Sequence, residues 1–241
     1  MDIKNEIVNF FKKYINEFEP DGGSGTQPGT INFDLTPRDF LDFAEKDLAH
    51  SESVHSLVNA TSNLKRAVDC QLDCFLVLLN LDKFYRSKRL GVDRKLGFLE
   101  RAGLFRSKSL EKLNKMRNEL EHQYAMPKIS DVEVYFDLVV AFVSVIESNV
   151  TLVGHNSEIG MSLDSGGMIE TKYIHSKPAI AIRLEHVDSN YRMEFMCDLS
   201  NSESNIETLK EFAFFLKVHS LLNAYYGGVA SSKHVLQALE T

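Results

Sequence analysis

The sequence predicts a mainly α-helical fold, in which an up-and-down helical bundle is followed by a small α+β region. Three observations support this prediction. Apolar residues recur at helical spacing through most of residues 36–150 of the 241. After Val150, glycines become frequent and short β-type runs appear. Residues 206–226 then return to a long apolar segment of helical length.

Residues 1–19 are predicted to form an amphipathic helix, because their apolar residues recur every three or four positions. Pro20 and the Gly-, Ser- and Pro-rich residues after it predict a flexible linker over 20–35. The helix is therefore expected to be a docking arm, which packs either on its own bundle or on a second subunit.

The predicted bundle spans residues 36–150. Thr36 can cap a helix and Pro37 is acceptable in its first turn, so a helical tract begins there. The tract is interrupted near residues 50–53, and its most apolar part is Val68–Leu81. Four or five helices joined by short loops favour up-and-down packing. The further helices are expected over 94–102, 108–125 and 131–150.

The C-terminal region, residues 151–241, has a mixed pattern. Residues 179–184 and 191–196 are β-type runs separated by a turn-like Asp-Ser-Asn, which predicts an antiparallel hairpin or a small meander. A helix over 206–226 is expected after a cap at Asn205 or Ser204. Because this helix is apolar on most sides, it needs cover from the hairpin or from another subunit.

Composition favours a soluble cytoplasmic protein. The chain is 44% hydrophobic with a net charge of -7, has no uninterrupted apolar run of membrane-spanning length, and starts without a signal-peptide pattern. Cys70, Cys74 and Cys197 form neither a disulfide framework nor a metal site, and buried structural roles are expected. Asp69 and Asp73 are interpreted as a solvated helix face, and His175 and His186 as surface or packing residues. No metal or cofactor is expected.

Charge is distributed unevenly along the chain. From Lys83 to Arg117, twelve basic residues face three acidic ones, a balance of +9, so the rest of the chain carries -16. Such a stretch is typical of a site for the phosphate backbone of a nucleic acid. The alternative is a solvated face that acidic neighbours balance. The expected RNA-binding residues are Arg86, Lys88, Arg89, Lys112 and Lys115.

The octapeptide 117–124, which reads R-N-E-L-E-H-Q-Y, points to a particular chemistry. Arg117 stays charged and can fork onto a phosphate, whereas His122 can give or take a proton near neutral pH. Asn118 is placed to orient the substrate or the histidine. These residues suit metal-independent cleavage of a phosphodiester.

Read as R-N-x-x-x-H-x-Y, the octapeptide resembles the signature of the HEPN superfamily, the higher eukaryote and prokaryote nucleotide-binding domains. The resemblance covers about residues 36–150 and implies a helical bundle, usually dimeric, with a composite RNA-cutting site. Arg117 and His122 match the family's catalytic pair, and Asn118 its polar residue. Tyr124 matches a tyrosine that a partner nucleotidyltransferase, acting as antitoxin, can adenylylate.

The spacing of the pair is consistent with a composite site. Five residues on a helix turn through a net angle of about 140°, so Arg117 and His122 do not lie one above the other. Two such helices in a homodimer would resolve the mismatch. The first hypothesis is therefore a metal-independent endoribonuclease of a toxin-antitoxin or phage-defence system. The alternative is a non-catalytic HEPN-like module that binds a nucleotide, RNA or a protein partner.

Overall fold

The computed structural model describes residues 2–25, 30–49, 53–106, 108, 115, 129–187, 191–201 and 203–240. The chain divides into two compact units that interleave along the sequence. The sheet unit contains residues 1–29, 79–104 and 149–241. The helical unit contains residues 30–78 and 105–148. The chain therefore leaves the sheet unit and returns to it twice.

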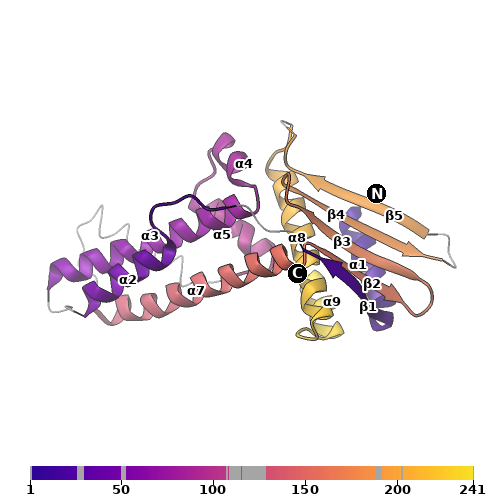
Figure 1. Cartoon of the computed structure of the whole chain (residues 1–241), viewed down its shortest axis with the longest axis horizontal. Helices are drawn as coiled ribbons and strands as arrows, with labels where there is room; N and C mark the ends of the chain where they lie inside the picture. Colours follow the sequence, from indigo (N-terminus) through magenta and orange to yellow (C-terminus); the bar gives the residue numbers. More distant parts are fainter. Residues whose placement is uncertain are drawn as a thin grey trace. The chain divides into compact units, whose positions relative to one another are not determined.

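The sheet unit is built on five antiparallel strands in the order β1-β2-β3-β4-β5 (Figure 1). Strands β2 to β5 follow one another as a meander, while β1 pairs with β2 from far away in the sequence: Ser24 lies opposite Glu158. The strands are β1 (Phe18–Ser24), β2 (Glu158–Leu163), β3 (Gly167–Ile174), β4 (Ala179–His186) and β5 (Tyr191–Asp198).

Helices cover one face of this sheet. Along β4, Ile180, Ile182 and Leu184 are fully buried, as expected where alternate side chains face a packed layer. α8 (Ile206–Tyr226) contacts β2 to β5, and the ring of Tyr14 at the end of α1 stacks on His186 of β4 at 4.7 Å. The first helices of this layer are α1 (Ile3–Tyr14) and the 3-10 turn η1 (Ile15–Glu17), and α9 (Ser232–Glu240) follows α8.

One short helix packs on α8 within the same unit, and a second short helix contacts the first. α5 (Val92–Arg101) contacts α8 through Phe98, whose ring stacks on Phe212 at 6.3 Å. α4 (Asp82–Ser87) joins this cluster through Tyr85, whose ring meets that of Phe98 edge-on. The returning segment 79–104 therefore adds a third layer over the helices of the sheet.

The helical unit contains three described helices. α2 (Pro37–Leu48) starts at a capping box in which Thr36 and Asp39 bond each other's backbone N–H, as the sequence predicted for Thr36. α2 packs along α3 (Val54–Leu78). The first twenty residues of α7 (Ile129–His155) belong to the same unit. The Arg38 guanidinium donates to both carboxylate oxygens of Glu147 on α7.

α7 is a long and strongly apolar helix. Within Asp131–His155, its most apolar 18-residue window has a mean hydropathy of 1.8, and a third of that window is buried. It is the only described helix with the length and composition to cross a membrane. Val139, Phe142 and Val143 are fully buried in the protein. A core helix of a packed protein meets the same criteria.

The predicted fold class is wrong. A mainly helical bundle with a small hairpin or meander does not fit the described residues, of which 61% are helical and 18% lie in strands, with a five-stranded sheet. The unexpected strands lie in residues 158–174, where glycines had indicated only turns and loops. Residues Glu158–Leu163 in fact alternate between half-buried and buried positions, which is the pattern of a strand with one covered face.

The second correction concerns the N-terminal segment. The predicted helix over 1–19 ends at Tyr14, and residues 18–24, placed partly in a linker, form β1. Only Phe18 of β1 is buried, and the strand contains Pro20 and two glycines, so its side chains give no strand signal. An edge strand tolerates such residues because one row of its backbone groups needs no partner. Within the sheet unit, five residues of α1 are buried, including Ile7, Phe10 and Phe11.

Candidate functional site

The whole predicted catalytic motif, residues 117–124, lies outside the part of the chain that the structure describes. The motif includes Arg117, Asn118, His122 and Tyr124, and the expected RNA-binding residue Lys112 also lies outside the described part. Lys115 is described as a helical, exposed residue. The described part of the predicted site is therefore the basic segment that precedes the motif.

The α4 cations are Lys83, Arg86, Lys88 and Arg89, on α4 and the turn after it. All four are exposed. Among the described residues, none of them has an ion-pair or hydrogen-bond partner for its side chain. The net charge of this segment is positive. It contains two carboxylates, Asp82 and Asp93, and the exposed Arg94 adds a fifth cation to these four. Exposed, uncompensated cations of this density attract a polyanion.

The position of Arg89 depends on how α4 ends. The N–H of Leu90 donates to the Tyr85 carbonyl at 3.0 Å, and the N–H of Arg89 donates to the Arg86 carbonyl at 3.2 Å. This pair of bonds is the Schellman motif, whose C′ residue must adopt the left-handed conformation. Arg89 does so, with φ of 52°. A residue with a Cβ atom is strained there by about 1–2 kcal/mol.

Two other helices of the sheet unit end in the same motif but use glycine. At the end of α5, Gly103 has φ of 68° and Leu104 donates to the Leu99 carbonyl at 3.0 Å. At the end of α8, Gly228 has φ of 69° and Val229 donates to the Ala224 carbonyl at 2.9 Å. α4 therefore has a charged side chain at the position that glycine would occupy at lower energy.

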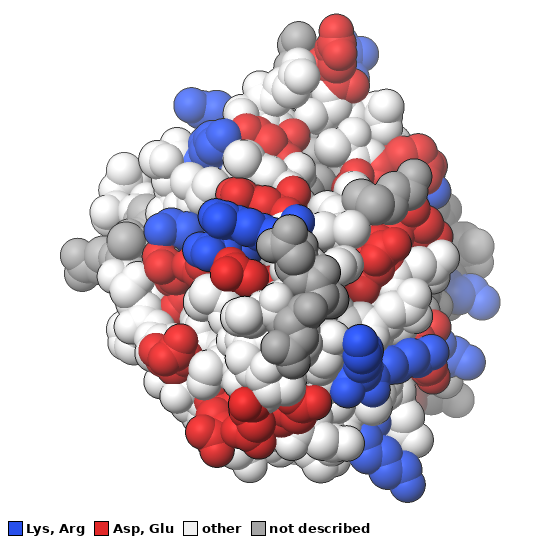
Figure 2. Space-filling model, turned by 90° about the vertical axis from the view of Figure 1, so that its right-hand side faces the viewer, with Lys and Arg blue, Asp and Glu red and all other residues white. Residues whose placement is uncertain are grey.

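Charges on the uncovered face of the sheet are arranged differently. Arg183 on β4 lies opposite Glu170 on β3 and Glu194 on β5, and its Nη2 donates to Glu185 at 2.6 Å. Lys172 on β3 binds Glu158 on β2 at 2.5 Å. Cross-strand pairs of opposite sign stabilise the sheet and leave little net charge. Figure 2 shows basic and acidic side chains interspersed on the face that it draws.

A buried polar network inside the sheet unit was missed in the sequence. His219 of α8 is fully buried; its Nδ1 lies 2.9 Å from the Thr171 hydroxyl and its Nε2 lies 3.3 Å from the Asn223 amide. Asn156 donates to the Asn223 side chain at 2.9 Å. Burial lowers the pKa of His219 to about 4. A histidine and an asparagine four residues apart on an apolar helix were the available signal.

The remaining candidate residues have structural environments. Lys65 binds Asp69 on α3, so this carboxylate belongs to an ion pair. Burial raises the pKa of Cys74 and that of Cys197 to about 12, which keeps both thiols protonated. His186 is 3.1 Å from the Ser165 hydroxyl and is buried under Tyr14. No group of three or more metal-ligating side chains occurs among the described residues.

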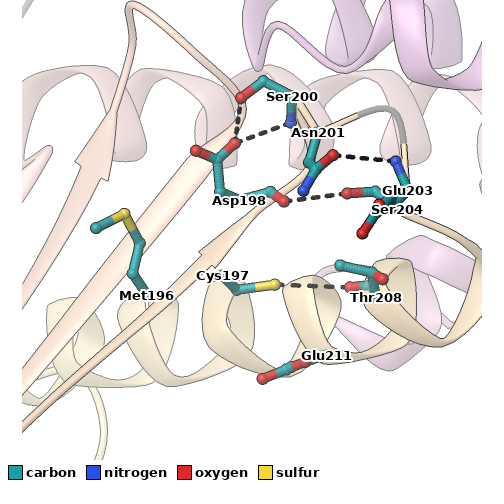
Figure 3. A pocket seen from close by; sticks show the side chains of 9 residues that line it. All are labelled: Met196, Cys197, Asp198, Ser200, Asn201, Glu203, Ser204, Thr208 and Glu211. Carbon is teal, nitrogen blue, oxygen red and sulfur yellow. Dashed lines mark hydrogen bonds between the residues drawn. The ribbon is translucent and has the colours of Figure 1, made fainter.

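A polar pocket of about 550 Å³ lies where β5 ends and α8 begins (Figure 3). Its polar groups already bind one another: the Ser200 N–H donates to Asp198 at 2.8 Å, and the Ser204 hydroxyl donates to the Asp198 carbonyl at 3.2 Å. Lys177 also binds Asp198, at 2.6 Å. The pocket lining contains the carboxylates of Asp198, Glu203 and Glu211 but no histidine, and its thiol, Cys197, is protonated. It is lined by Met196, Cys197, Asp198, Ser200, Asn201, Glu203, Ser204, Thr208 and Glu211.

Comparisons with known proteins returned no match. No protein-family model matches the chain, and neither the curated proteins nor the solved structures gave a match. The α4 cations, together with the octapeptide that follows them in the sequence, are therefore the features from which a function is inferred.

Proposed function

We propose that the protein is a metal-independent endoribonuclease of HEPN type. The observation that carries the proposal is the octapeptide 117–124, with Arg117 and His122 at the spacing of a catalytic pair. His122 deprotonates the ribose 2′-hydroxyl or protonates the leaving 5′-oxygen, and Arg117 neutralises charge on the phosphoryl oxygens. Asn118 orients the substrate or the histidine. The product carries a 2′,3′-cyclic phosphate.

The α4 cations support this proposal from the described part of the chain. Arg86, Lys88 and Arg89 were expected to bind RNA, and they are exposed and lack anionic partners among the described residues. A single-stranded polyanion gains affinity from such cations by releasing its condensed counterions. The overall net charge of -7 makes a local basic segment necessary if the protein is to bind RNA.

The test is RNA cleavage by the purified full chain in EDTA. We expect His122→Ala and Arg117→Ala each to lower the cleavage rate by about 10²- to 10⁴-fold, the usual contribution of a general acid or base. His234→Ala, at an exposed histidine of α9, is the matched control and should cleave like the wild type. Unchanged cleavage in both motif variants would remove the catalytic assignment. RNA binding without cleavage by the wild type would favour the non-catalytic module.

The working unit in this proposal is a cytoplasmic homodimer with a composite site, silenced by a nucleotidyltransferase that modifies Tyr124. If each site takes its arginine and its histidine from different chains, a mixture of Arg117→Ala and His122→Ala protomers regains part of the activity after subunit exchange. No recovery after exchange would show that one chain provides both residues. Adenylylation by a partner is tested with Tyr124→Phe, which should resist modification.

A further inference from the structure

The two outer strands of the sheet differ in how they could accept another strand. In β1, Pro20 has no N–H to donate, the register shifts between Pro20 and Gly22, and Gly22 has φ of 120°. A proline and a bulge both protect an edge against pairing. β5 has neither: its eight residues Tyr191–Asp198 pair with β4 in a continuous register.

The direction of the β5 backbone groups follows from the ladder. The Leu199 N–H donates to the Pro178 carbonyl at 2.9 Å, one step beyond the opposition of Asp198 to Ala179. In an antiparallel pair, residues alternate between bonding to the neighbouring strand and pointing away from it. The odd-numbered residues of β5 therefore bond to β4. The N–H and C=O groups of Arg192, Glu194 and Met196 therefore point away from β4, at the open edge of the sheet.

These outward groups have no partner among the described residues. Within the described part of the chain, no hydrogen bond to the main chain of Arg192, Glu194 or Met196 is formed on the side away from β4. The side chains of all three are exposed, and Met196 retains 55% of its accessible surface. A regular edge strand in this state is a template on which another strand can pair.

We propose that β5 pairs antiparallel with β5 of a second copy of this chain, about a two-fold axis at Met193. In this register Arg192 lies opposite Glu194 of the partner subunit, and Glu194 lies opposite Arg192 of the partner subunit. Tyr191 lies opposite the partner's Phe195 on the helix-covered face. The two five-stranded sheets become one. This inference does not depend on the proposed ribonuclease activity.

Charge complementarity selects this register. Because a shift by one residue would exchange the two faces of the strand, the alternatives are shifts by two. One such shift brings Arg192 against its own copy, and the other brings Glu194 against its own copy. Like charges directly opposite each other destabilise a strand pair, whereas opposite charges stabilise it. The alternation of Arg192 and Glu194 on an otherwise open edge therefore fits self-pairing centred on Met193.

Disulfide trapping tests the axis. In the full chain with Cys70→Ser, which removes the one incompletely buried native thiol, Met193→Cys places two cysteines opposite each other across the axis. We expect this variant to form a covalent dimer under mild oxidation. Met196→Cys is the matched control: its side chain is highly exposed, but its two copies would lie about 20 Å apart, six residues along the strand. Equal or faster trapping of the control would overturn the proposed axis.

Charge reversal tests the register in the same trapping assay. On the Met193→Cys background, Arg192→Glu alone and Glu194→Arg alone create two like-charge pairs across the axis, and each should slow trapping about tenfold. An equal mixture of the two variants should recover trapping as a heterodimer, because the reversed residues then face opposite charges. Normal trapping in each single variant, or no recovery in the mixture, would refute the register. Matching melting temperatures establish that all variants are folded.

Discussion

The α4–α5 segment and the uncovered face of the sheet are both rich in charge, but they treat it in opposite ways. On the sheet, Arg183 faces Glu170 and Glu194 and binds Glu185. On α4 and its turn, Lys83, Arg86, Lys88 and Arg89 lie exposed without a carboxylate partner among the described residues. Both regions contain several cations, but Arg183 on the sheet has carboxylate partners, whereas the α4 cations have none among the described residues.

This difference is what we expect if charge on the sheet stabilises the fold and charge on α4 binds the proposed RNA ligand. Paired surface charges contribute up to about 1 kcal/mol each to stability and attract little from solution. The α4 cations have no carboxylate partner among the described residues, and Arg89 has an unfavourable backbone conformation. A polyanion such as RNA would provide the missing partner.

The largest expected effect is on RNA affinity. Replacing Arg86, Lys88 and Arg89 together with glutamine should lower affinity roughly 100-fold at low salt, and should reduce the slope of log affinity against log salt by about 2. The physical reason is that fewer phosphates are neutralised on binding, so fewer condensed counterions are released from the RNA. Affinities for a single-stranded RNA, measured by fluorescence anisotropy at several salt concentrations, provide the test.

The sheet provides a control with the same charge change. Replacing Lys172, Lys177 and Arg183 with glutamine also removes three cations, but ones that are paired with carboxylates. RNA affinity should then change by less than a few fold. If the two triple variants lose affinity equally, RNA responds to overall charge and the proposed difference between the two regions disappears.

The second effect concerns the buried histidine of the interior. His219 is buried with a pKa of about 4, against 6.5 for an ordinary histidine. The unfolded chain therefore binds a proton first, so this contribution to stability is complete above pH 6.5 and is lost as the pH falls towards 4. Between pH 7 and 5 the free energy of unfolding should drop by about 2 kcal/mol through this residue.

Urea unfolding of wild type and His219→Asn at pH 7, 6 and 5 measures this contribution. The variant should be less stable at pH 7, because a buried hydrogen bond and some packing are lost. It should, however, lose about 2 kcal/mol less on acidification than the wild type. His234→Asn, at an exposed position, should follow the wild type at every pH. Parallel pH curves for wild type and His219→Asn would contradict the prediction.

The third effect compares the ends of α4 and α5. Arg89→Gly should stabilise the protein by about 0.5–1 kcal/mol, since it relieves strain at φ of 52° and this exceeds the entropic cost of glycine. Gly103→Ala, at φ of 68°, should destabilise it by about 1 kcal/mol. Both changes are measured by urea unfolding. Effects of the same sign would mean that the two ends are not equivalent.

The smallest effect is expected for a paired cation in the helical unit. Arg38 and Glu147 form an ion pair in which both side chains are at least 40% exposed. A double-mutant cycle with Arg38→Gln and Glu147→Gln should give a coupling free energy of about 0.5 kcal/mol that decreases as salt is added. A coupling free energy above 2 kcal/mol would show that exposed pairs in this protein are stronger than the comparison assumes.

Sequence reasoning succeeded where the signal is local. The helix predicted over 206–226 begins and ends at those residues, with Asn205 as its cap. Thr36 caps α2, and the runs at 179–184 and 191–196 lie within β4 and β5. Each of these features depends on periodicity or capping within a few residues, so neighbouring side chains contain the information.

Prediction failed where distant segments meet. β1 has almost no strand signal, because its backbone pairs with β2 more than 130 residues later and its side chains contribute little. His219 could be identified as a candidate core histidine, but its bond to Thr171 of β3 depends on how α8 lies on the sheet. Long-range contacts of this kind require the packed structure, since no local pattern encodes the partner.

The sequence by itself determined the elements of the chain: the octapeptide 117–124, the basic stretch before it, and most helices and the last two strands, because each is set by residue type and short spacing. Only the tertiary structure decided which charges are paired. Sequence patterns do not distinguish the charge environment of Arg183 from that of Arg86. The strand ladder places carboxylates opposite Arg183 on both neighbouring strands, whereas Arg86 has no carboxylate partner among the described residues. Electrostatic function depends on distance between side chains, and the fold alone sets that distance.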